Sequence, residues 1–217
     1  MFSEPMGSLY SLNMGLITGQ RYNYLIDTGL GSGSVIPVIR YLSGDNKPVV
    51  VINTHHHWDH IWGNFLFGNS LIAAHALCRE LADEKWDIML TENTEFLDGG
   101  TEKCLPNLVF SDSLEFSDDS IELFYTPGHS IDCISVFDRI DRVLYAGDNI
   151  GDTEETVIPY IETGIALFRD TLSRYREYDF SVCVSGHNRP FGKEIISRME
   201  RDLDRCWEKQ LAKFPKG

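Results

Sequence analysis

The chain has 217 residues, of which 42% are hydrophobic, and this length and composition fit one α/β domain with a sizeable core. Acidic residues outnumber basic ones by 33 to 19, giving a formal net charge of −14, which disfavours nucleic acid as a partner because nonspecific binding to phosphates needs a basic surface. No apolar run is long enough to span a membrane and the N-terminus lacks the pattern of a signal peptide, so we expect a cytoplasmic protein with no membrane partner. The oligomeric state stays open.

The first quarter of the chain predicts a hairpin, a helix and a buried strand. Residues 9–17 alternate between apolar and polar and, with residues 22–26, are typical of two strands joined by a turn. Residues 34–42 have helical spacing, with Ser34 as the expected cap and Gly44 as the terminator. Residues 49–53 are an apolar, β-branched run, which predicts a buried parallel strand.

A histidine-rich stretch, His55-His56-His57-Trp58-Asp59-His60, begins where that strand ends. Side chains two residues apart in an extended segment point the same way, so His55 and His57 can face one metal ion while His56 faces the opposite side. Asp59 and His60 lie where the chain must turn and can be aimed at a second ion. Imidazole suits zinc and iron, and a carboxylate offsets the charge of the cation. The alternative is a solvated histidine-rich loop, which need not follow a buried strand.

The middle of the chain predicts a strand, a helix and a loop. Residues 71–74 favour a short strand and residues 76–90 a helix, whereas residues 91–107 are polar, turn-rich and expected to be non-helical. A loop of this length is commonly functional or mobile. It either covers the metal site with Phe96 and Leu97 or is a surface excursion.

Three further residues that can bind metal follow predicted strands. Strands are expected at residues 108–110, 114–116, 121–125, 134–137, 143–145 and 182–184, and helices at residues 165–178 and 193–212. His129 follows Pro127-Gly128, Asp148 follows Gly147, and His187 follows Gly186. Active sites of open α/β sheets gather at the ends of strands. One such residue alone is more often a cap or a loop residue, but the three together with the histidine-rich stretch indicate a metal site.

These motifs resemble the metallo-β-lactamase superfamily, with its His-x-His-x-Asp-His signature at residues 55–60, Pro-Gly-His at 127–129, Gly-Asp at 147–148 and Gly-His at 186–187. The resemblance implies an α/β fold, a four-layer αββα sandwich formed as a single domain by residues 1–217, with a dinuclear site at one edge. It implies that His55, His57 and His129 hold the first metal, that Asp59, His60 and His187 hold the second, and that Asp148 bridges them. Asp27, in a Leu-x-Asp-Thr-Gly element, is either a residue that orients the metal ligands or part of an ordinary turn.

The implied chemistry is metal-dependent hydrolysis of a small-molecule substrate. Two divalent ions, zinc as the first expectation with iron or manganese as alternatives, lower the pKa of a bridging water so that hydroxide attacks a carbonyl. Asp148 would take part as the bridge and Asp59 would pass a proton. One true lactamase branch carries a cysteine at the bridging position, so Asp148 points towards the glyoxalase II-like or lactonase-like branches. A thioester or lactone is therefore favoured over a β-lactam.

Two other functions stay open at this point. A mononuclear non-haem iron persulfide dioxygenase uses the same fold with only the first set of ligands, which the complete second set, including His60 and His187, disfavours. A non-catalytic metal-binding protein is the other alternative.

Residues near the expected metal site divide into those expected to contact substrate and those expected to pack. The segment 149–163, with Tyr160, is the expected place of substrate contacts. Trp58 and Trp62 are expected to pack the metal loop instead, and His75 to begin a helix, since the family pattern assigns it no metal role.

Overall fold

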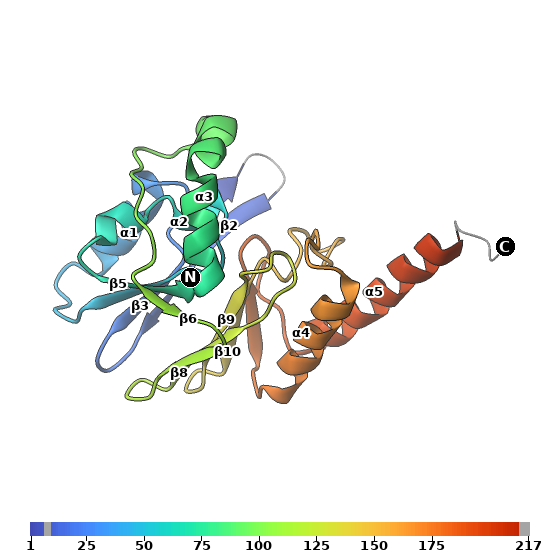
Figure 1. The fold of residues 1–217 in the computed structure, drawn as a ribbon. Helices are drawn as coiled ribbons and strands as arrows, with labels where there is room; N and C mark the ends of the chain where they lie inside the picture. The colour runs from blue at the N-terminus through green and yellow to red at the C-terminus, as the bar shows by residue number, and fades with distance from the viewer. Residues whose placement is uncertain (7–9, 213–217) are drawn as a thin grey trace.

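The computed structural model describes residues 1–6 and 10–212, which form two sheets with helices on their outer faces (Figure 1). The first sheet has the order β1 (Phe2–Met6), β2 (Tyr10–Thr18), β3 (Asn23–Ile26), β4 (Val49–Ile52), β5 (Leu71–His75) and β6 (Leu108–Phe110). The second has the order β11 (Val182–Ser185), β10 (Val143–Gly147), β9 (Ile134–Asp138), β8 (Ile121–Tyr125) and β7 (Ser113–Phe116).

Helices complete the outer layers. The α-helices are α1 (Ser32–Tyr41), α2 (Trp58–Ile61), α3 (Ala76–Asn93), α4 (Ile165–Glu177) and α5 (Glu194–Ala212), and two 3₁₀ helices are η1 (Asn64–Phe67) and η2 (Thr94–Phe96). α1 lies with α2 and α3 on the side of the first sheet, whereas α4 and α5 lie together on the side of the second (Figure 1). This α/β architecture is the αββα sandwich expected from the sequence.

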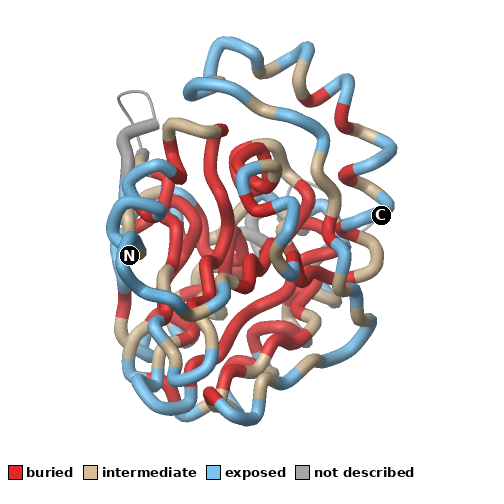
Figure 2. The backbone as a smooth tube through the Cα atoms, turned by 90° about the vertical axis from the view of Figure 1, so that its left-hand side faces the viewer, coloured by how far each residue is buried: buried red, intermediate tan, exposed pale blue. Residues whose placement is uncertain are grey.

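Strand β4 explains why the sandwich has a core on both faces of its first sheet. It runs parallel to β3 and to β5, as its β-branched sequence predicted. Val50 and Ile52 join the core between the two sheets, while Val51 joins the core against Val35 and Val38 of α1. Figure 2 shows the resulting pattern, with buried backbone through the middle and exposed backbone at the periphery.

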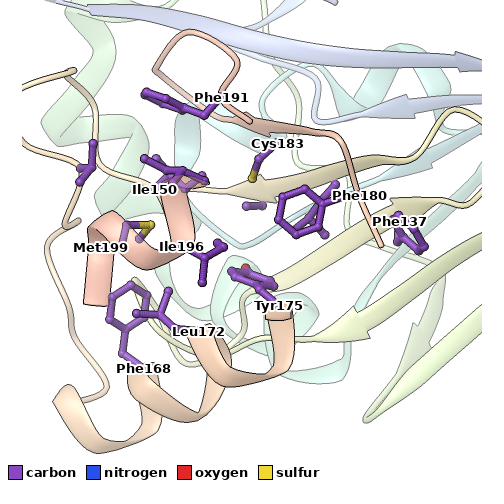
Figure 3. Packing of buried hydrophobic residues seen from close by; sticks show 14 of the residues in the cluster. Phe137, Ile150, Phe168, Leu172, Tyr175, Phe180, Cys183, Phe191, Ile196 and Met199 are labelled. Atoms are coloured by element: carbon purple, nitrogen blue, oxygen red, sulfur yellow. The ribbon is translucent and has the colours of Figure 1, made fainter. Parts of the chain in front are cut away.

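The second sheet is covered by a larger apolar core (Figure 3). Phe168, Leu172 and Tyr175 recur at helical spacing along α4 and are fully buried, against Ile196 and Met199 of α5. Burying one such side chain contributes about 1.5–3 kcal/mol. The apolar face of α4 therefore packs against the sheet that carries three of the residues predicted to bind metal.

Two sequence expectations were wrong in detail, and one strand was not predicted. Helix α1 begins after Gly31 rather than at Ser34, whose hydroxyl lies inside the first turn and accepts a hydrogen bond from the Leu30 amide. The segment 91–107 begins in helical form, because α3 continues to Asn93 and η2 follows. Strand β1 was not predicted.

Two polar side chains near the end of α3 bond back to the backbone of the helix. Thr91 Oγ1 donates to the Asp87 carbonyl and Asn93 Nδ2 to the Met89 carbonyl, in each case one turn earlier. Residue 9 of the predicted hairpin lies outside the described residues. Within the described part of the chain, no helix has both the length and the hydrophobicity that a membrane span requires.

Candidate metal centre

The structure brings the residues predicted to bind metal together at one edge of the sandwich, where both sheets contribute. The first sheet supplies the residues of the metal loop (residues 54–60), which follows β4 and includes most of α2. The second sheet supplies residues that follow β8, β10 and β11. The full set is His55, His57, Asp59, His60, His129, Asp148 and His187.

The first group consists of His55, His57 and His129. His57 Nδ1 lies 3.0 Å from both His55 Nε2 and His129 Nε2. Burial lowers the pKa of His57 to about 3, and burial, aided by the charge of His60, holds the pKa of His55 well below its ordinary value. These rings therefore stay neutral and keep a lone pair, which is the form that binds a metal ion.

The second group consists of Asp59, His60 and His187. Asp59 Oδ2 lies 3.2 Å from His187 Nε2 and 3.6 Å from His60 Nε2. Burial opposes the charged form of both rings, but the negative charges of Asp148 and Asp59 outweigh it and raise the pKa of His60 and of His187 well above the ordinary value. This group therefore differs from the first in holding charge.

Asp148 lies between the two groups. Its Oδ2 is 3.2 Å from His187 Nε2 and 3.3 Å from His60 Nε2. The same oxygen is 3.7 Å from His55 Nε2 and 3.8 Å from His129 Nε2. Burial raises the pKa of Asp148, but the charges of His187 and His60 outweigh it and hold the pKa well below the ordinary value. A charged oxygen thus faces rings from both groups at once.

Backbone and carboxylate acceptors orient these rings. Asp27 Oδ2 accepts hydrogen bonds of 2.8 Å from His60 Nδ1 and from Thr54 Oγ1, and Asp27 Oδ1 accepts one from the Thr54 amide. The Nδ1 atoms of His129 and His187 lie 3.0 and 3.1 Å from the carbonyls of Tyr160 and Ser11. Because a carbonyl only accepts, these Nδ1 atoms carry the proton and each Nε2 faces the cluster with its lone pair in the neutral ring. Asp27 is thus an orienting residue as well as part of a turn.

The donor set fits a divalent metal ion. Within the described residues, three overlapping triads bring their ligand atoms within 4.8 Å of one another: His55, His57 and His129; His55, His60 and Asp148; and Asp59, His60 and His187. His60 Nε2 and Asp148 Oδ1 are buried and have no hydrogen-bond partner within that part of the chain. Buried polar atoms are normally paired, and a metal ion would satisfy such atoms.

A cavity of about 230 Å³ opens onto the cluster. Its lining includes five of the residues predicted to bind metal and also Trp58, Asp152, Pro159 and Tyr160. Tyr160 therefore reaches the cavity, as the segment 149–163 predicted, and its contact with substrate stays a prediction. Asp152 lies in the same predicted segment but was not named as a site residue.

Trp58 does more than the packing expected of it. It packs against Trp62, which is fully buried, but it also lines the cavity. Phe96 stacks on Trp58 with ring centroids 5.3 Å apart, so η2 lies behind this wall of the cavity. Neither Phe96 nor Leu97 lines the cavity, so whether the segment 91–107 covers the metal site stays a prediction.

The solvated-loop alternative is contradicted by burial of the histidine-rich stretch, in which His55, His56 and His60 are at most 1% exposed. His75 begins α3 as expected, since its Nδ1 accepts a hydrogen bond from the Leu77 amide.

Comparison with known proteins agrees with this geometry. The family model described as the metallo-beta-lactamase superfamily matches residues 9–187. The acyl-coenzyme A thioesterases MBLAC2 of Bos taurus and Homo sapiens are 27% and 26% identical, with 86% of this chain and 76% of each relative covered. Among solved structures, TMB-1 has a TM-score of 0.74 at 18% identity over 94% of this chain and 91% of its own. A metallo-beta-lactamase from Hirschia baltica has a TM-score of 0.71 at 19% identity over 89% and 86%. The chain therefore belongs to the metallo-beta-lactamase superfamily and is a metal-dependent hydrolase.

Proposed function

We propose that this chain is a dinuclear hydrolase that cleaves a small thioester of the acyl-coenzyme A type. The observation that carries the proposal is the position of Asp148 Oδ2, within 3.8 Å of imidazole nitrogens from both groups. A mononuclear iron site can also use one carboxylate beside two histidines, but a single ion would not need ligand atoms from both groups. The relatives named as acyl-coenzyme A thioesterases support the choice of substrate.

In this proposal one metal ion would be held by His55, His57 and His129, the other would be held by Asp59, His60 and His187, and Asp148 would be shared between them. Zinc is the first expectation, with iron or manganese as alternatives. When bound, the two ions supply an activated water and polarise the thioester carbonyl. Asp59 lies beside the cavity and would hold the proton that the water gives up.

The wall of the cavity supports an acyl substrate. Trp58, Pro159 and Tyr160 line it, and Phe96 backs Trp58. These rings present apolar surface beside the metal centre, where an acyl group would exchange water for aromatic contact. A lactone with an acyl tail would fit the same wall, so the thioester carbonyl itself has to be tested.

The first test is the metal content of protein purified without added metal or chelator. Close to two equivalents per chain, together with thiol release from acyl-coenzyme A, is the expected result. We expect kcat/KM to rise with acyl length until the cavity is filled, by roughly tenfold for each 1.4 kcal/mol of apolar contact.

Two results would replace the proposal with an alternative. One equivalent of iron and oxygen consumption with a persulfide would identify a mononuclear dioxygenase. Retained metal without turnover of esters, thioesters, lactones or β-lactams would identify a non-catalytic metal-binding protein.

A further inference from the structure

A second polar cluster lies directly behind the metal loop, on the side that faces away from the cavity. Lys85 Nζ is 3.1 Å from His56 Nε2, and His56 Nδ1 is 2.9 Å from Asp132 Oδ1. Ser130 Oγ donates to the same Asp132 oxygen at 2.7 Å. His56 is 1% exposed and Asp132 is fully buried.

Elementary chemistry sets the direction of these hydrogen bonds. An ammonium group has only donors, so Lys85 donates and His56 Nε2 accepts. His56 Nδ1 then carries the ring proton and donates it to Asp132. The histidine is thus held in one tautomer and one orientation between a cation and an anion.

This cluster is costly to bury, which argues against a space-filling role. A buried carboxylate loses the hydration of both oxygens, and Asp132 Oδ2 has no hydrogen-bond partner within the described residues. The hydrogen bonds that offset this cost reach Oδ1, from His56 and Ser130. Apolar side chains of similar size would fill the same volume without that cost.

The cluster joins the two loops that supply the first metal group. His56 lies between His55 and His57 in the chain, and Ser130 directly follows His129. The loops come from different sheets and are joined by one further bond nearby, from the Ile134 amide to the Thr54 carbonyl at 2.8 Å. Asp132 therefore ties the neighbour of His57 to the neighbour of His129, the two rings whose ligand atoms lie 3.0 Å apart.

We propose that Asp132, His56 and Lys85 are positioning residues that set the separation of His57 and His129 and thereby the affinity of the first group for its metal ion. Lys85 extends the chain of contacts to α3, so that this helix helps to hold the metal loop. The proposal rests on the metal site and not on the choice of a thioester as substrate.

The test compares two buried histidines with similar surroundings. His56→Gln breaks the link, whereas His75→Gln is the matched control, because His75 also has both ring nitrogens engaged, with the Leu77 amide and the Ser111 carbonyl, but lies outside the three metal-capable triads. Co²⁺ binding is measured for each equivalent by competition with a chelator, together with the visible spectrum of the bound Co²⁺. We expect His56→Gln to lower the Co²⁺ affinity of one site about 10–100-fold and to change the visible spectrum of the Co²⁺ bound there. The affinity of the other site, and both affinities in the His75→Gln control, should keep the parent values.

Two milder variants keep the test decisive if His56→Gln does not fold. Lys85→Met alters a half-buried side chain and should shift the same equivalent in the same direction by a smaller factor. Asp132→Ala removes the acceptor and should lower the affinity of the first group for its metal ion. Asp132→Asn retains an acceptor oxygen and should lose less of that affinity.

The proposal is overturned if the folded variants bind both equivalents as the parent does, or if His75→Gln reproduces their loss. Normal Co²⁺ binding by the parent protein without thioester turnover would refute only the proposed substrate.

Discussion

Asp27 illustrates how a single carboxylate can prepare a metal ligand. It adopts a backbone φ of 61°, in the left-handed region that aspartate tolerates better than most residues, and this turn aims both of its oxygens at the metal loop. Its bond to His60 Nδ1 leaves Nε2 facing Asp59 and Asp148.

Asp27→Asn should therefore weaken the metal ion bound by the second group about 10–100-fold and leave the first group nearly unchanged, because the amide nitrogen cannot accept the His60 proton. Stepwise Zn²⁺ affinities measured by chelator competition check this. Asp119→Asn is the matched control, since Asp119 is also buried and accepts bonds from the Arg21 amide and the Tyr24 hydroxyl at the opposite end of β8. Equal loss in both variants would show a general effect on stability.

The two groups should also respond differently to pH. His57, with a pKa of about 3, is already neutral near neutral pH and need not be deprotonated before it binds metal. His60 and His187 have raised pKa values and stay protonated, so a metal ion must displace a proton from each ring. Lowering the pH from 8 to 6 should then lower the affinity of the second group for its metal ion about tenfold per pH unit for each proton displaced. The affinity of the first group should change much less. Calorimetric titrations in buffers of different ionisation enthalpy count the released protons. If the two metal ions displaced equal numbers of protons, the proposed difference between the two groups would be contradicted.

At the scale of elements, glycine before a ligand allows two strand ends to approach. Gly186 separates β11 from His187, and a Cβ at this position would overlap Asp148 Oδ1 and lie 2.9 Å from His60 Cε1. The small residue is needed for close approach, whatever its backbone conformation.

Gly186→Ala should displace Asp148 and lower kcat/KM about 100-fold, since a shift of about 1 Å in a catalytic group has an effect of that order. Thioester turnover and metal content measured together would show whether the loss follows the metal. Gly68→Ala serves as the control because its Cβ would be 3.5 Å or more from other atoms. Unchanged turnover in Gly186→Ala would mean that Asp148 can retreat without consequence.

Sequence patterns predicted elements whose signals are local. The β-branched run 49–52 and the alternating residues of β8 revealed buried strands, and the glycines before Asp148 and His187 marked where those strands end. Strand β1 was missed because Phe2–Met6 lacks clear alternation and contains Pro5, although it pairs antiparallel with β2. The link between His56 and Asp132 was equally inaccessible, because it joins residues 76 positions apart.

At the scale of the whole molecule, the candidate metal centre is a link between two sheets. The metal loop belongs to the first sheet and His129, Asp148 and His187 to the second, so an ion that binds the folded protein holds the layers together. Binding to the native state alone stabilises it by about 2.7 kcal/mol when free metal is 100 times the dissociation constant.

Removal of metal with a chelator should therefore lower the Tm by roughly 5–11 °C, at about 2–4 °C per kcal/mol for a chain of this size. Thermal unfolding followed by circular dichroism, with and without chelator and after adding Zn²⁺ back, measures the shift. An unchanged Tm in protein shown to have lost its metal would separate metal binding from the assembly of the sandwich.

The contact between β2 and the loop of His187 has a consequence for folding. His187 Nδ1 bonds to the Ser11 carbonyl, and Asn13 reaches the same loop through its amide to Gly186 and its side chain to the carbonyls of Ser185 and Asn188. A slip of β2 by one residue would turn each of these groups away, since successive residues of a strand face opposite sides. Metal binding therefore depends on the correct register of β2. Chains that fold with β2 in the wrong register would fail to bind metal, and their fraction could be measured in this way.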